Sequence, residues 1–168
     1  MIYDNLLDYS DFCGVQVKEH HQFSGRHFKG LYILGDILLS KKIKTTTEKA
    51  CVLAEELGHY HKTAGNILDQ TKTENRKQEL VARAWAYDKL VGLEGLIHAY
   101  HAGCENIHEG AEVLEVTENF LKEAIEYYVA RYGIGVTFKG HNIRFEPLRV
   151  ESIDDETQIS QIDKGITA

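Results

Sequence analysis

Three ionisable side chains that can bind a cation or move a proton lie close together in the segment 53–60. Glu55 and His59 are four residues apart, so on a helix they lie on one face and can contact the same ion. Glu56 follows Glu55 directly, and its carboxylate can accept a proton from a water molecule near that ion. The segment therefore predicts a metal site with a carboxylate base beside it.

The third metal ligand is expected on the next long helix, over residues 73–91. Glu79 lies near the start of this helix, and the small residue Ala82 follows it. Two antiparallel helices joined by a loop of this length can bring Glu79 opposite Glu55 and His59. Three protein ligands leave one coordination position open for water, which is typical of catalytic rather than structural sites.

The pattern resembles the HExxH signature of zinc metalloproteases, in which two histidines bind zinc and the glutamate is the general base. Glu55 stands in place of the first histidine, while Glu56 and His59 fill the other two positions. The chain also resembles the ImmA/IrrE family of metallo-endopeptidases, which joins a zinc helix of the pattern AHELGH to a downstream helix of the pattern E-x-x-A-x-x-F-A. Residues 54–59 match the first pattern except at Glu55, and residues 79–86 match the second with tryptophan in place of phenylalanine.

The resemblance covers residues 15–91 best, and it implies an activity, a cofactor and a partner. Family members cleave, or help to inactivate, helix-turn-helix repressors of prophages and other mobile elements. The resemblance thus implies that this chain is a zinc endopeptidase that acts on such a repressor. An extended segment of the repressor would pair, as a strand, with the edge of a small sheet. The ligands would be Glu55, His59 and Glu79, with Glu56 as the base. The form with two successive glutamates is similar to the phage-borne branch of the family.

Glu55 changes the chemistry expected of the site. Two carboxylates and one imidazole leave a divalent ion formally neutral, so the ion acidifies water less than in a two-histidine site. The oxygen-rich ligand set also widens the choice of metal from zinc toward manganese. We therefore expect weaker zinc binding or slower hydrolysis. The alternative is a catalytically silent protein-binding module that grips the repressor and inactivates it without cutting.

Two other reactive side chains near the motif are expected to play no part in the chemistry. His61 lies two residues after His59, so on a continuing helix it points to the far side. Cys51 has no histidine partner in the sequence, and we expect a buried thiol rather than a nucleophile.

An α+β fold is expected to position the site. Alternating residues near 15–17, followed by two short strands at 30–34 and 37–39, predict a small antiparallel sheet packed on a helical zincin-like core. Thr45 and Glu48 form a capping box, and the helix that carries the motif is predicted over 46–61. Further helices are expected at 96–102, 107–114 and 117–132, with a β-hairpin between 136 and 145. The chain is accordingly divided into a metallopeptidase core (1–92), a helical part with the hairpin in the same compact unit (93–150) and a flexible acidic tail (151–168).

Length and charge restrict the classes of protein that are compatible with this chain. The 168 residues suit one domain, or one domain with a small appendage. The net charge of −7 argues against a nucleic-acid partner, and the acidic helix at 117–132 would be repelled by phosphates.

No apolar run approaches the ~20 residues of a membrane span, and no secretory signal is visible. A reduced cytoplasmic location is expected, since the three cysteines show no disulfide pattern.

Overall fold

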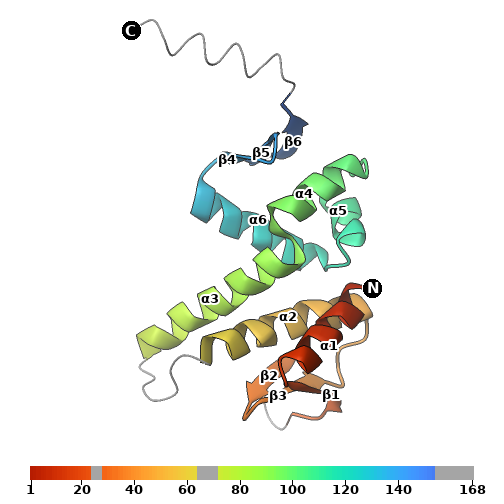
Figure 1. Ribbon diagram of the computed structural model, residues 1–168, viewed down its shortest axis with the longest axis vertical. Helices are drawn as coiled ribbons and strands as arrows, with labels where there is room; N and C mark the ends of the chain where they lie inside the picture. The colour runs from red at the N-terminus through yellow and green to blue at the C-terminus, as the bar shows by residue number, and fades with distance from the viewer. Residues whose placement is uncertain (24–27, 64–71, 154–168) are drawn as a thin grey trace, which may run out of the picture.

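A computed structural model describes residues 1–23, 28–63 and 72–153, and the chain forms six helices and two small sheets in this part (Figure 1). The helices are α1 (Ile2–Phe12), α2 (Thr46–Thr63), α3 (Lys72–Leu90), α4 (Gly92–His101), α5 (Ile107–Val113) and α6 (Glu118–Tyr132). The strands are β1 (Gln16–His21), β2 (Gly30–Ile33), β3 (Asp36–Ser40), β4 (Gly135–Phe138), β5 (His141–Phe145) and β6 (Leu148–Ser152). The predicted α+β fold is confirmed.

The first sheet has the strand order β1-β3-β2 and packs against α2. Strands β2 and β3 form the antiparallel hairpin that the sequence predicts. Strand β1, however, pairs in parallel with β3, so the sheet is mixed rather than wholly antiparallel. The partner of β1 is separated from it in sequence by another strand, and local sequence does not specify such a pairing. One edge of β2 therefore has no neighbouring strand among the described residues.

Helix α2 begins where the capping signal places it. The Thr45 hydroxyl accepts a hydrogen bond from the backbone N–H of Glu48 at 3.1 Å, which satisfies one of the amides that a helix start leaves without a partner. The Glu48 carboxylate pairs with the Lys29 ammonium at 2.7 Å rather than reaching back to the helix start as expected. The cap thus also ties α2 to the chain just before β2.

Helices α2 and α3 approach so closely that one position tolerates no side chain. A Cβ atom at Gly58 would lie 2.3 Å from the carbonyl oxygen of Ala82, far inside van der Waals contact. Leu53 and Leu57 are fully buried on α2, and Ala86 is fully buried on α3. This contact fixes the position of α3 along α2, and hence which residues of α3 face α2.

The second sheet lies beyond α4, α5 and α6 and has the antiparallel order β4-β5-β6 (Figure 1). Strands β4 and β5 form the hairpin expected between 136 and 145. Strand β6 was not expected, because the sequence turns polar from Val150 onward. Its edge position explains this composition, since Arg149, Glu151 and Ser152 are exposed. The tail predicted over 151–168 therefore begins too early, and residues 154–168 lie outside the described part.

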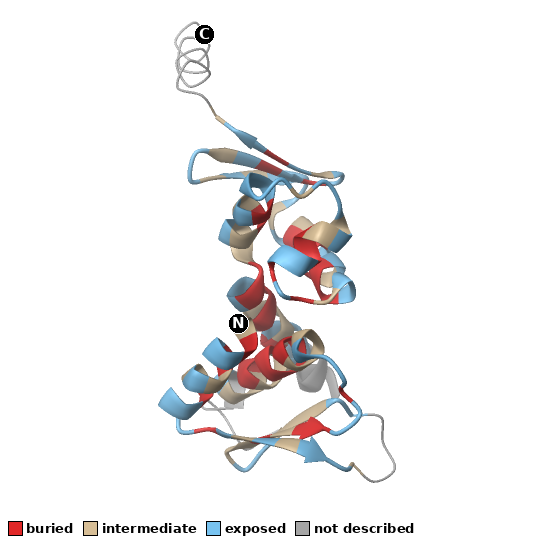
Figure 2. Cartoon of the chain, turned by 90° about the vertical axis from the view of Figure 1, so that its right-hand side faces the viewer, coloured by how far each residue is buried: buried red, intermediate tan, exposed pale blue. Residues whose placement is uncertain are grey.

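Buried apolar side chains form one cluster that runs from Tyr3 to Val150. Figure 2 shows buried residues both in the helices next to the first sheet and in those next to the second sheet. The boundary predicted at 92/93 falls in the first turn of α4, two residues after the end of α3, and the division into parts is still a prediction. None of the helices in the described ranges is long and apolar enough to cross a membrane.

Candidate active site

Helix α2 carries the three residues of the motif on its partly buried side. Glu55, Glu56 and His59 are all neither fully buried nor fully exposed. One helical turn separates Glu55 from His59, so both side chains leave the helix in similar directions. The local placement therefore agrees with the sequence-based prediction for these three residues.

Glu79 reaches His59 from the neighbouring helix. Its Oε2 lies 3.2 Å from Nε2 of His59, and this contact joins α3 to α2. The sequence predicted that two antiparallel helices would bring these residues together. The close approach at Gly58, next to His59 in the chain, is the packing feature that places them opposite each other.

Glu55 lies in an environment that disfavours its charge. Burial raises the pKa of its carboxyl, the Arg83 guanidinium opposes that shift, and the carboxylates of Glu123 and Glu79 add to it. Among the described residues, Glu55 has no hydrogen bond or ion pair. A partly buried carboxylate beside like charges is costly, and a bound cation would offset that cost.

Glu56 is held between α2 and the first sheet. Its Oε2 accepts a hydrogen bond of 2.8 Å from the backbone N–H of Tyr32 on β2. Burial raises the pKa of Glu56 to about 7; the Tyr32 hydrogen bond opposes this shift, and the charges of Glu55 and Glu79 reinforce it. A carboxyl whose pKa lies near the working pH can both accept and return a proton.

The absence of a side chain at residue 30 makes room for this carboxylate. A Cβ atom at Gly30 would lie 2.6 Å from Oε1 of Glu56 and 2.6 Å from Cγ1 of Val52. Any other residue at this position would force the side chains of Glu56 and Val52, or β2 itself, to shift. No local signal in the sequence marks this glycine, because the clash depends on the distance between a strand and a helix.

The types of donor at the site fit a divalent cation. Two carboxylates and an imidazole suit zinc or manganese, and His59 and Glu79 already lie within 3.2 Å of each other. Glu55, without a hydrogen-bond partner in the described ranges, is the third donor that the sequence predicts. Within the part of the chain that the structure describes, however, no three His, Cys, Asp or Glu side chains lie together closely enough to hold one metal ion.

Arg83 contacts Glu79, and Glu123 contacts Arg83 in turn. Neither residue was expected at the site from the sequence. Arg83 donates from Nε to Oε1 of Glu79 at 3.2 Å, and its Nη1 lies 3.6 Å from Oε2 of Glu123 on α6. Arg83 is four residues after Glu79, a spacing that brings side chains together on a helix and was visible in the sequence. Glu123 had no such signal, because it comes from a helix distant in the chain.

The other two reactive side chains lie where the sequence places them. The Nε2 atom of His61 is 3.0 Å from the Tyr9 hydroxyl, and its ring lies 4.7 Å from that of Trp85. Cys51 is buried, with its Sγ 3.4 Å from the backbone N–H of Thr117. Burial raises the pKa of the Cys51 thiol to about 11, which makes it a poor nucleophile. The burial predicted for the Cys51 thiol is confirmed.

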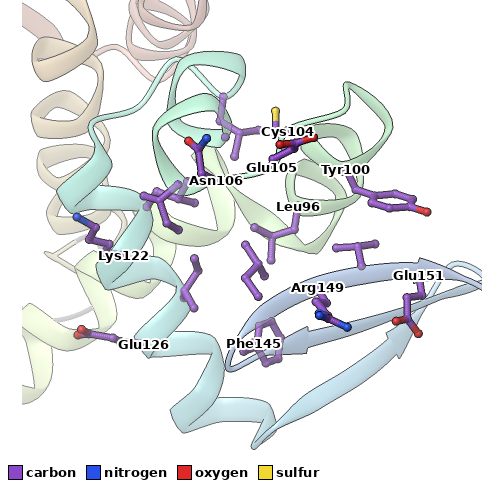
Figure 3. Close-up of a pocket in the computed structure, with 18 residues that line it drawn as sticks. Leu96, Tyr100, Cys104, Glu105, Asn106, Lys122, Glu126, Phe145, Arg149 and Glu151 are labelled. Carbon is purple, nitrogen blue, oxygen red and sulfur yellow. The ribbon is translucent and has the colours of Figure 1, made fainter.

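A cavity of about 580 Å³ lies elsewhere, between the helices α4, α5 and α6 and the second sheet (Figure 3). Apolar side chains such as Leu96 and Phe145 line its interior, and Lys122, Glu126 and Arg149 stand around it. None of its lining residues belongs to the α2–α3 site. The candidate site at the junction of α2, α3 and β2 is therefore separate from this cavity.

Comparison with family models matches residues 14–126 to the IrrE N-terminal-like domain, which is a peptidase family. The matched range contains the first sheet, α2, α3 and Glu123. Comparisons with curated proteins and with solved structures gave no match. Because the family match spans more than half of the chain, the resemblance found in the sequence is confirmed, and the chain belongs to the ImmA/IrrE family.

Proposed function

We propose that this chain is a cytoplasmic, metal-dependent endopeptidase that cleaves, and so inactivates, a helix-turn-helix repressor of a prophage or mobile element. The observation that carries the proposal is the contact of 3.2 Å between His59 and Glu79. It brings residues of two helices together beside the partly buried carboxylate of Glu56. Membership of a peptidase family supports the same activity.

Glu55, His59 and Glu79 would hold the metal, which is zinc with manganese as the alternative. A divalent cation supplies Lewis acidity at this position when it is bound. The two carboxylates contribute negative charge, and His59 contributes the softer nitrogen ligand. Family membership implies a divalent metal, and the choice among metals follows from this donor set.

Glu56 would move the proton during hydrolysis. Its carboxylate accepts a proton from the attacking water while the water oxygen forms a bond to the carbonyl carbon of the substrate. The same carboxyl then donates this proton to the peptide nitrogen as the C–N bond breaks. Its place against the Tyr32 amide keeps the carboxylate next to the strand where substrate would lie.

The free edge of β2 would hold the substrate chain. Strand β2 is at the end of the order β1-β3-β2 and contacts α2. An extended segment that pairs with such an edge gains main-chain hydrogen bonds regardless of its sequence. The net charge of −7 favours a protein segment over nucleic acid as the partner.

Metal content tests the site directly. We expect about one equivalent of zinc or manganese in the purified protein, measured by mass spectrometry, and loss of the metal in Glu55→Ala, His59→Ala and Glu79→Ala. His61→Ala is the matched control, because this histidine lies on the same helix but contacts Tyr9. Wild-type protein that takes up neither metal at micromolar concentration would contradict the proposal.

Cleavage tests the reaction. A panel of purified helix-turn-helix repressors is incubated with the metal-loaded wild type or with Glu56→Gln, and new termini are identified by mass spectrometry. We expect cleavage by the wild type only, with both proteins binding the repressor equally. If Glu56→Gln inactivates the repressor as well as the wild type does, the chain is instead a silent anti-repressor.

A further inference from the structure

A continuous chain of polar contacts links α6 to the candidate metal site. Glu123 of α6 accepts hydrogen bonds from the Tyr87 hydroxyl at 3.0 Å and from Nδ2 of Asn119 at 2.7 Å. These two donors hold its carboxylate in place. Its Oε2 also lies 3.6 Å from Nη1 of Arg83. Glu123 is thus a fixed anion to which the arginine of α3 is attached.

Arg83 in turn holds one oxygen of Glu79 and leaves the other directed at His59. Its Nε lies 3.2 Å from Oε1 of Glu79, whereas Oε2 of Glu79 lies 3.2 Å from Nε2 of His59. Ligating carboxylates in metal sites are commonly held through a hydrogen bond to a neighbouring group. The two Glu79 oxygens therefore have separate partners, and one of them faces the imidazole.

We propose that Arg83 is a positioning residue for Glu79 and that Glu123 anchors it, so that α6 completes the metal site supplied by α2 and α3. This inference rests on the proposed function, since it assigns Glu79 to the metal. It also gives α6 a role in the site, for which the local sequence of this helix offered no signal. Arg83 acts through Glu79 and is not itself a catalytic residue.

The charge of Arg83 and its hydrogen bond to Glu79 predict opposite effects on metal affinity when Arg83 is removed, so a measurement of affinity distinguishes them. A guanidinium near a cation site repels the cation, so its removal alone would tighten metal binding. Loss of the hydrogen bond that orients Glu79 would instead weaken binding, by about 10- to 100-fold for contacts of this kind. A weaker site in Arg83→Met therefore comes from lost positioning of Glu79 or from looser docking of α6, and not from the removed charge.

The chain offers a matched control in a second ion pair between the same two helices. Arg131 of α6 lies 2.9 Å from Asp88 of α3, and its exposed fraction of 47% is close to the 40% of Arg83. Arg131→Met removes an α3–α6 ion pair without removing a contact to Glu79. If Arg83 serves only to dock the helices, both variants should behave alike.

The experiment measures zinc affinity by competition with a chromophoric chelator for wild type, Arg83→Met, Glu123→Gln, the double variant and Arg131→Met. We expect a loss of about 10-fold or more in Arg83→Met, a smaller loss in Glu123→Gln and no change in Arg131→Met. The double variant should be no weaker than Arg83→Met, since Glu123 acts through Arg83. Unchanged or tighter binding by Arg83→Met, or additive losses, would overturn the inference.

A second readout keeps the inference testable if the wild type binds no zinc, a result that would overturn the proposed function alone. In the metal-free protein, the NMR signals of the His59 imidazole should shift in Arg83→Met and in Glu123→Gln. They should stay in place in Arg131→Met. Identical His59 signals in all four proteins would show that neither Arg83 nor Glu123 positions the group that faces this histidine.

Discussion

Glu55 is the residue that distinguishes this site from a site with two histidines. Its carboxylate has the carboxylates of Glu79 and Glu123 for neighbours, and Arg83 is the basic residue that offsets them most. A histidine at the same position would bring no negative charge and would relieve that repulsion. The ligand set therefore carries more negative charge than a set with two histidines, and oxygen ligands favour harder cations.

We expect Glu55→His to increase the preference for zinc over manganese on the order of tenfold, which corresponds to about 1.4 kcal/mol. The physical reason is that imidazole suits zinc, whereas carboxylates are good ligands for manganese. Competition titrations with the two metals measure the ratio. Glu48→His on the first turn of α2 serves as the control, and a ratio unchanged by Glu55→His would show that residue 55 is not a ligand.

At the scale of residues, the sequence predicted that Glu55 and His59 share one face of α2, because spacing on a helix determines which side chains share a face. It also predicted that Glu79 lies opposite His59, because a short loop makes consecutive helices antiparallel neighbours. It did not predict the arginine and the anion behind Glu79. The four-residue spacing of Glu79 and Arg83 is visible in the sequence, but this spacing of glutamate and arginine is also common on solvent-exposed helices. Glu123 reaches the site only through the packing of α6 on α3, which no local pattern specifies.

The pair α2 and α3 is the element on which the geometry of the site depends. The expected helices over 46–61 and 73–91 correspond closely to α2 and α3, since caps and apolar periodicity are local signals. Two features could not be found in this way. The parallel pairing of β1 with β3 joins strands that are not consecutive, and β6 is an edge strand with mostly exposed polar side chains.

We expect Gly58→Ala to lower the free energy of unfolding by about 1–3 kcal/mol, as is typical when a methyl group is forced into a packed contact. The added methyl would meet the Ala82 carbonyl at 2.3 Å, and backbone cannot move aside as a side chain can. Chemical denaturation of the metal-free protein measures the change.

Gly95→Ala on α4 is the matched control for this substitution. Its new methyl would meet only the end of the Leu114 side chain, with Cδ2 at 3.1 Å. Alanine is favoured over glycine in helices by about 1 kcal/mol. The effect at residue 95 should therefore be smaller. Equal stability of Gly58→Ala and the wild type would mean that α2 and α3 are less tightly packed than described.

For the molecule as a whole, the metal would join two helices that also meet through packing and through the contact between His59 and Glu79. Glu55 and His59 belong to α2 and Glu79 belongs to α3, and both helices contribute to the single cluster of buried side chains. A ligand that binds only the folded chain stabilises it according to its concentration and affinity. Global stability therefore reports on the site.

We expect zinc at about 100 times its Kd to stabilise the fold by about 2.7 kcal/mol, which for a chain of this size raises Tm by roughly 5–10 °C. A chelator should reverse the rise, and His59→Ala should abolish it. Calorimetry of the wild type, His59→Ala and His61→Ala provides the measurement. An equal rise in His59→Ala would place the stabilising ion elsewhere.

Gly30 has a consequence for how the chain tolerates mutation. It has no functional group, yet its missing methyl leaves the space that the Glu56 carboxylate occupies. In a genetic screen for inactive alleles, substitutions at this glycine would cluster with those at Glu56, although the strand bearing them would still form. Part of what specifies the chemistry is thus an absence of side-chain volume at Gly30, 26 residues before Glu56.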